Sequence, residues 1–262
     1  MPPSDPVFHL EGLTVEIGGK SLLRDVSFAV ASQEMLCVIG ESGAGKSTLL
    51  KALQGFLPAS CRSLVYQPSG TRISGRMPTM SGLPQTRWVM QDPLAALNPR
   101  LTLGASIGES LYGQKLTAQA RKAAVLDALA EVELEAEFYN RLPGQVSLGQ
   151  AQRACLARAL IARPALIFFD EPLSALDALV QKKIARQMDE LRRKMQTTFI
   201  VVTHDLGFAA TYADKILVLR QGEVEAYQEN TAFFANPNSA YATELIGAAS
   251  SLGALDPIRE TA

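Results

Sequence analysis

The chain has 262 residues, of which 47% are hydrophobic, and its formal net charge at pH 7 is −1. This size and composition allow one large domain with a full core, and the near-neutral charge gives no electrostatic reason to expect nucleic acid as a partner. No apolar run approaches the ~18 residues that a membrane-spanning helix needs, and the first residues lack the pattern of a signal peptide. Three widely spaced cysteines predict reduced thiols in a cytosolic protein, so we expect membrane attachment only through a partner.

The first ninety residues predict short strands around one glycine-rich loop. Apolar and polar residues alternate over residues 7–15, Gly18 and Gly19 indicate a turn, and residues 22–30 predict the return strand. The apolar run 35–39 is typical of a buried strand. After the loop comes a helix that we expect to end at about Phe56. Strand-like pieces then indicate a small antiparallel excursion before one further strand; these are residues 63–66, 71–73 and 87–90.

The rest of the chain alternates helices with apolar strands. Helical patterns cover residues 101–141, with Thr117 as an expected N-cap, and about 147–162. Buried strands are predicted at 165–169 and 198–203, with an amphipathic helix between them. A strand pair at 215–219 and 224–227, short helices and a poorly ordered tail from residue 248 complete the chain. This alternation predicts an α/β fold with a mostly parallel sheet covered on both faces.

The glycine-rich loop fits the pattern G-x-x-x-x-G-K-[ST] between a predicted strand and a predicted helix. Glycines let the backbone curl so that its N–H groups surround a triphosphate, and the helix N-terminus adds partial positive charge. Lys46 is expected to reach the β- and γ-phosphates of ATP, and the Ser47 hydroxyl to ligate Mg²⁺. The expected nucleotide-binding residues are Gly40, Glu41, Ser42, Gly43, Ala44, Gly45, Lys46, Ser47 and Thr48.

Four polar residues follow directly after other predicted strands. Because ligands bind at the carboxyl ends of parallel strands, we expect all four near the phosphate loop. Asp170 is expected to hold Mg²⁺ and Glu171 to act as the general base for the attacking water. Gln91 is expected to contact the metal or the water, and His204 the γ-phosphate. An acidic helix cap and a core histidine are the alternative interpretations of the carboxylate pair and of His204.

These motifs together resemble the ATPase subunit of an ABC transporter, over about residues 7–247. The resemblance covers Walker A (40–47), the Q-loop (Gln91), the signature motif (146–150), Walker B (166–170), the D-loop (174–177) and the switch histidine (His204). It implies a P-loop NTPase with an N-terminal antiparallel β subdomain and a helical subdomain inserted at about residues 95–162. It also implies that Ser147, Gly149 and Gln150 complete an ATP site on a second ATPase subunit.

The segment QDPLAALNP, at residues 91–99, narrows the resemblance to the importers of oligopeptides, dipeptides, nickel and opines or metallophores. That branch implies a second, different ATPase subunit, two membrane permease subunits and an extracytoplasmic solute-binding protein. The chain would then lie at the cytoplasmic face of the inner membrane. Two alternatives remain: a non-transport ABC ATPase, such as a subunit of a phosphonate-cleaving assembly, and a non-hydrolysing nucleotide-binding regulator, against which Glu171 and His204 argue.

Two residues depart from the family pattern. Leu148 replaces the first glycine of the LSGGQ signature, and a leucine restricts both the backbone dihedrals and close approach. Ile17 occupies the position of the aromatic residue that usually stacks on adenine. We therefore expect two unequal ATP sites and weak discrimination between adenine and other bases.

Overall fold

The computed structural model describes residues 6–251, 253 and 255. It consists of two compact units, here called unit 1 (residues 1–85 and 198–262) and unit 2 (residues 86–197). Each unit carries part of the predicted motifs. Unit 1 contains the phosphate loop and His204, whereas unit 2 contains Gln91, the signature motif, Asp170 and Glu171.

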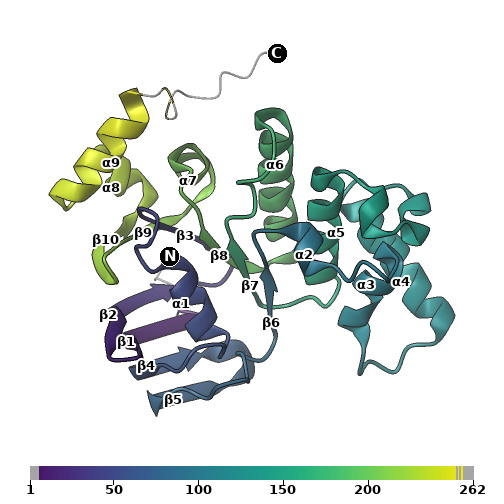
Figure 1. The fold of residues 1–262 in the computed structure, drawn as a ribbon, viewed down its shortest axis with the longest axis horizontal. Helices are drawn as coiled ribbons and strands as arrows, with labels where there is room; N and C mark the ends of the chain where they lie inside the picture. The colour runs from purple at the N-terminus through teal and green to yellow at the C-terminus, as the bar shows by residue number, and fades with distance from the viewer. Residues whose placement is uncertain (1–5, 252, 254, 256–262) are drawn as a thin grey trace. The chain divides into compact units, whose positions relative to one another are not determined.

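Unit 1 contains an antiparallel sheet in the order β2-β1-β4-β5 (Figure 1). Its strands are β1 (Phe8–Ile17), β2 (Lys20–Val30), β4 (Ser60–Tyr66) and β5 (Thr71–Arg76). The side chains of Phe8, Phe28 and Tyr66 pack together on the buried face, with the first two rings stacked at 5.5 Å. The predicted antiparallel excursion is therefore confirmed, although β4 and β5 are longer than the sequence pattern indicated.

A second set of strands in unit 1 surrounds β3 (Met35–Ile39), which is buried along its whole length. It pairs in parallel with β8 (Thr198–Val202) and β9 (Lys215–Arg220), and β9 pairs antiparallel with β10 (Glu223–Glu229). The helices of this unit are α1 (Lys46–Leu53), α7 (Leu206–Tyr212), α8 (Asn230–Ala235) and α9 (Ala240–Ser251), with a short 3-10 turn at Gln67–Ser69.

Two expected boundaries in unit 1 were wrong. Helix α1 ends at Leu53 rather than at about Phe56, because the Phe56 N–H bonds Lys51 O and the Gly55 N–H bonds Ala52 O, which closes the helix. Helix α9 continues to Ser251, past the expected start of a tail at residue 248. The rest of that expected tail lies outside the described residues, apart from residues 253 and 255.

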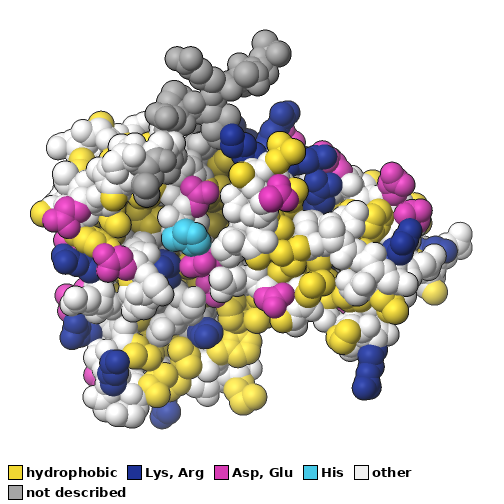
Figure 2. Space-filling view, turned by 45° about the horizontal axis from the view of Figure 1, so that its top comes forward, with side chains coloured by type: hydrophobic (Ala, Val, Ile, Leu, Met, Phe, Trp, Pro, Cys, Tyr) yellow, Lys and Arg dark blue, Asp and Glu magenta, His cyan; other side chains and the backbone are white. Residues whose placement is uncertain are grey.

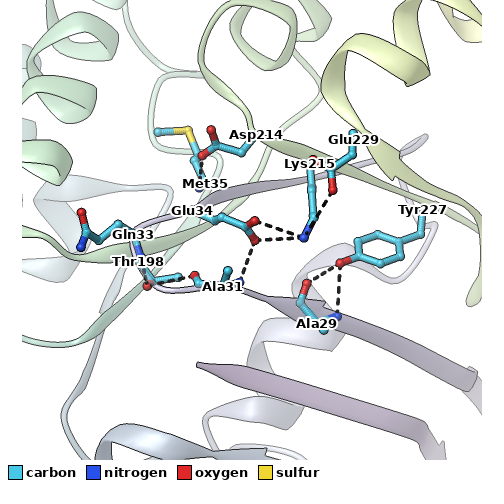
Figure 3. Close-up of polar contacts among 10 residues, drawn as sticks. All are labelled: Ala29, Ala31, Gln33, Glu34, Met35, Thr198, Asp214, Lys215, Tyr227 and Glu229. Carbon is cyan, nitrogen blue, oxygen red and sulfur yellow. Dashed lines mark hydrogen bonds and ion pairs between the residues drawn. The ribbon is translucent and has the colours of Figure 1, made fainter. Parts of the chain in front are cut away.

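Polar contacts join the start of β3 to the strands around it (Figure 3). The Lys215 ammonium lies 3.1 Å from one oxygen of the Glu34 carboxylate and 3.5 Å from one oxygen of the Glu229 carboxylate. Burial is the largest single effect on Lys215 and opposes its charge, but the hydrogen bond to Glu34 and the charges of Glu34, Tyr227 and Glu229 together outweigh it, so the pKa of Lys215 is raised. The Tyr227 hydroxyl donates to Ala29 O and accepts from the Ala29 N–H, which ties β10 to β2.

Unit 2 pairs β6 (Thr86–Val89) in parallel with β7 (Leu166–Asp170). Its helices are α2 (Pro93–Ala96), α3 (Leu103–Gly108), α4 (Ala118–Glu131), α5 (Leu148–Leu160) and α6 (Ala178–Met195), with 3-10 turns at Glu109–Leu111, Ala136–Asn140 and Pro143–Gln145. Helix α5 packs against α2, α3 and α4 (Figure 1). The predicted N-cap Thr117 is confirmed, since its hydroxyl accepts from the Ala120 N–H. Parallel apolar strands alternating with helices confirm the α/β fold class.

The charged side chains are mixed in sign. Figure 2 shows acidic and basic groups interspersed over the face drawn there. In the described part of the chain, no helix combines the length and the apolar character needed to cross a bilayer. The three cysteines are buried and form no disulfide within the described residues, and burial raises the pKa of Cys155 to about 11.

Candidate functional site

The phosphate loop connects the end of β3 to the first turn of α1. Three of its glycines, Gly40, Gly43 and Gly45, have φ angles of 149°, 81° and 104°. The chain passes so close to β9 at Gly40 that an added Cβ would lie 2.2 Å from the Leu219 carbonyl oxygen. Only glycine fits such a contact, so this approach fixes where the loop leaves the sheet.

Lys46 is the first residue of α1, and its side chain is 6% exposed. Its ammonium group donates hydrogen bonds to Gly40 O at 2.7 Å and to Glu41 O at 2.9 Å. The positive charge is thus held inside the curve of the loop, where the N-terminus of α1 also favours an anion. A loop of this form, with a buried ammonium at its centre, fits a phosphate group.

The loop is fixed from outside by the turn between β9 and β10. The Gly222 N–H donates to Ala44 O at 3.0 Å, and Gly222 O accepts from the Arg24 N–H at 2.8 Å. Arg24 also forms an ion pair with Glu223 at 2.7 Å. Sequence reasoning missed this support, because no local pattern links residues so far apart in the chain.

His204 lies just after β8 and is exposed. The loop around it is well defined: Thr203 Oγ1 accepts from the Asp205 N–H, and Asp205 caps α7 by accepting from the Phe208 N–H. At the other end of α7, the Asn230 side chain donates to two carbonyls at 2.7 Å, those of Ala209 and Ala213. Unit 1 therefore holds the phosphate loop and His204 at the carboxyl ends of adjacent strands, β3 and β8.

Ile17 ends β1 and pairs with Lys20 across the turn to β2. Its side chain is 42% exposed, unlike most apolar residues of β1. An exposed apolar side chain at this position offers van der Waals contact to a planar base, without the stacking that an aromatic ring provides.

In unit 2, Asp170 is the last residue of β7 and is 7% exposed. Glu171 follows it with a φ angle of 45°, a left-handed conformation that costs a non-glycine residue on the order of 1 kcal/mol. Strained backbone conformations of this kind are concentrated at functional sites. There they give a side chain an orientation that an unstrained backbone would not allow.

The side chains of Gln91 and Ser174 meet at Glu171. The Gln91 amide lies 3.3 Å from the Glu171 carboxylate and 3.4 Å from Ser174 Oγ, and Ser174 Oγ donates to Glu171 O at 3.1 Å. Gln91 therefore lies close to Glu171, as expected. Ser174 was not expected to join this cluster; its position in the D-loop was the only signal in the sequence.

The signature motif begins α5. Ser147 Oγ accepts from the Gln150 N–H at 3.3 Å, and Gln150 Oε1 accepts from the Ser147 N–H at 2.8 Å, which forms a capping box. Leu148 is half-buried in the first helical turn. It is not one of the described residues that have a positive φ angle. Leucine therefore adopts the backbone conformation of this position without strain, and the expected hindrance of close approach to a second subunit stays a prediction. Gly149 is the crowded position, since an added Cβ would lie 2.9 Å from Val180.

The family model described as ABC transporter matches residues 23–174, a range that contains the phosphate loop, Gln91, the signature motif, Asp170 and Glu171. The chain belongs to the ABC transporter family. It contains the ATP-binding domain of that family, whose ATP-binding subunits are ATPases.

Similar proteins carry related names. A probable peptide ABC transporter ATP-binding protein of Sinorhizobium fredii is 37% identical over 87% of this chain and 65% of its own length. The oligopeptide transport ATP-binding protein OppF of Haemophilus influenzae is 34% identical over 86% of this chain and 69% of its own length. The chain thus spans about two thirds of these relatives. An ATP-binding cassette solved as a dimer bound to ADP and Pi is similar at a TM-score of 0.68, with 26% identity over 85% of this chain and 98% of that one.

Proposed function

We propose that this chain is the ATP-binding and ATP-hydrolysing subunit of an importer, built as one ABC ATPase domain over residues 7–247 with its helical subdomain at about 95–162. The observation that carries the proposal is the phosphate loop, with the buried Lys46 ammonium inside the curve formed by Gly40 and Glu41. Membership of the ABC family supports ATP as the nucleotide.

We propose a role in ATP binding and hydrolysis for each predicted site residue. Lys46 and the backbone N–H groups of residues 40–48 bind the phosphates, and His204 contacts the γ-phosphate. Glu171 accepts a proton from the attacking water, and Gln91 orients that water or the carboxylate. Mg²⁺, held by Ser47, Asp170 and Gln91 together with phosphate oxygens, would neutralise charge as the terminal phosphoryl group leaves.

Ser147, Gly149 and Gln150 are proposed to complete the site of a second ATPase subunit. The capping box supports this role, because it fixes the Ser147 hydroxyl at the N-terminus of α5, where an anion is favoured. Leu148 would stand in only one of the two sites of a heterodimer, and we therefore propose a different second subunit.

The transport partners are proposed from the relatives. Proteins similar to this chain are named for peptide and oligopeptide transport, which supports an importer rather than a non-transport ATPase. We propose two membrane permeases and an extracytoplasmic solute-binding protein as partners, at the cytoplasmic face of the inner membrane. A small peptide, nickel or a metal chelate is the proposed solute. Co-purification with permease subunits from solubilised membranes tests this; a soluble complex without permeases would contradict it.

The nucleotide site is tested by Lys46→Ala, with Lys51→Ala as the matched control. Both lysines lie on α1, but Lys51 is exposed. Binding of Mg-ATP to the full chain, followed by titration calorimetry, should be lost in Lys46→Ala and unchanged in Lys51→Ala. Because Lys46 bonds two loop carbonyls, thermal unfolding must be followed in parallel. Mg-ATP binding by a folded Lys46→Ala variant with wild-type affinity would refute the assignment.

A further inference from the structure

Helix α7 begins two residues after His204, so a shift of this helix along its axis also moves the histidine. The helix has only seven residues, and a helix this short is marginal in water unless other parts of the protein hold it. Its N-terminus is capped by Asp205, which accepts from the Phe208 N–H at 2.8 Å. Thr203 Oγ1 in turn accepts from the Asp205 N–H at 3.0 Å. The N-terminal end of α7 is therefore joined to the segment that follows β8.

One side chain holds the other end of α7. The side-chain amide of Asn230, the first residue of α8, donates to the carbonyl oxygens of Ala209 and Ala213 at 2.7 Å and to that of Ala210 at 3.4 Å. Carbonyl groups at the end of a helix lack partners within the helix, and they form the negative end of its dipole. The Asn230 amide supplies the donors that this end of α7 needs, from a distant part of the sequence.

Asn230 is itself fixed to the start of β3. Its backbone N–H donates to Asp214 O at 2.9 Å. The Asp214 carboxylate accepts from the N–H of Met35, the first residue of β3, at 2.7 Å (Figure 3), and the Asp214 N–H donates to Met35 O at 2.8 Å. The other end of β3 leads into the phosphate loop. Asn230 therefore ties α7 to the same strand that carries this loop.

We propose that Asn230 is a positioning residue for His204, an inference that rests on the proposed contact between His204 and the γ-phosphate of ATP. By holding the C-terminus of α7 against the start of β3, the Asn230 amide keeps the histidine where it meets that phosphate. His204 and the phosphate loop follow adjacent parallel strands, β8 and β3, so a fixed α7 sets the separation between them. Asn230 lies at the opposite end of α7 and acts through the helix.

The test compares ATP with ADP, because only ATP has the γ-phosphate. Asn230→Asp keeps the shape of the side chain but replaces the donor with a carboxylate oxygen, which the helix carbonyls repel. We expect the affinity of the full chain for Mg-ATP to fall by about threefold to tenfold, the range of one hydrogen bond, while its affinity for Mg-ADP stays at the wild-type value. Titration calorimetry measures both affinities. Amide hydrogen exchange over residues 206–213 of the nucleotide-free chain should become faster in the same variant.

Gln228→Glu is the matched control, since it makes the same chemical exchange and adds the same charge two residues away. The Gln228 amide donates to Asn236 O at the C-terminus of α8, rather than to α7. This control should leave both nucleotide affinities and the hydrogen exchange of α7 unchanged. Asn230→Ala removes the donor without adding charge. It should show the same pattern as Asn230→Asp with a smaller effect, and it takes the place of that variant if the aspartate prevents folding.

His204→Ala measures the γ-phosphate contact itself. In that background Asn230→Ala should not lower the affinity for Mg-ATP further, because the contact is already lost. The inference is overturned if the Asn230 variants keep the wild-type preference for ATP over ADP, or if both affinities fall together as stability falls. If His204→Ala lowers this preference and the Asn230 variants do not, only the positioning role fails. If His204→Ala keeps the preference, the proposed γ-phosphate contact fails and the positioning role fails with it.

Discussion

Ser147 caps α5, and we propose that it also contacts the nucleotide of a second subunit; three variants separate the two roles. Ser147→Ala removes the acceptor for the Gln150 N–H, a contact of 3.3 Å. Loss of an N-cap costs about 1 kcal/mol, and the other arm of the capping box, at 2.8 Å, weakens with it. Helix α5 has 13 residues, many of them buried, so we expect it to remain folded with a small loss of stability.

Thr117→Ala is the matched control, because Thr117 caps α4 in the same unit by the same kind of contact, at 3.1 Å. Both alanine variants should lower the free energy of unfolding by about 1 kcal/mol, measured by urea denaturation. Only Ser147→Ala should also lower ATP turnover in the assembled transporter. Loss of one hydrogen bond to a charged phosphate corresponds to a reduction of roughly tenfold or more.

Ser147→Asp completes the set. Aspartate caps a helix about as well as serine, so α5 and its stability should be preserved. The added carboxylate would face a phosphate across the subunit interface, and turnover should fall further than in Ser147→Ala. If Ser147→Asp and Thr117→Ala both turn over ATP at the wild-type rate, Ser147 is only a helix cap, and the assignment of the signature motif is refuted.

Three further variants address the remaining motifs. Glu171→Gln should bind Mg-ATP but not activate water, so light scattering should show an ATP-dependent dimer of the partnered complex; wild-type hydrolysis would show that another group is the base. Leu148→Gly should raise turnover of the full complex if the leucine limits closure, and an unchanged rate, equal to that of the chain alone, would contradict unequal sites. Ile17→Tyr should tighten ATP binding by ~0.5–1.5 kcal/mol through stacking, whereas the native chain should bind GTP within about tenfold of ATP; a strong native preference for ATP would mean that another aromatic residue contacts the base.

The fold followed from local patterns wherever burial decides structure. The apolar runs around β3, β7 and β8 predicted strands because their residues are buried on both sides. The end of α1 was misplaced, since the hydrogen bonds that close it at Gly55 and Phe56 compete with continued helix and leave no apolar period to detect. Periodicity reports which face is buried, and it says little about where a helix stops.

The parts of the candidate site that lie in one continuous stretch of sequence were predictable. The phosphate loop and the pair Asp170–Glu171 are each read from one stretch of sequence. The left-handed backbone of Glu171 and the Gln91 contact depend on tertiary packing, and neither has a local sequence signature. The joint action of the motifs on one ATP stays a prediction, as do the roles of His204 and the signature residues.

The support that the β9–β10 turn gives the phosphate loop decides where this protein can accept foreign sequence. Hairpin turns are common sites for inserted tags and reporter domains, because most of them face solvent. The turn at Gly70 is of that kind: an added Cβ there meets nothing within 4 Å. At Gly222 an added Cβ would lie 2.4 Å from Leu22 O, and the Gly222 N–H bonds the loop at Ala44. A fluorescent label inserted at Gly70 should therefore leave nucleotide binding intact, whereas the same label at Gly222 should abolish it.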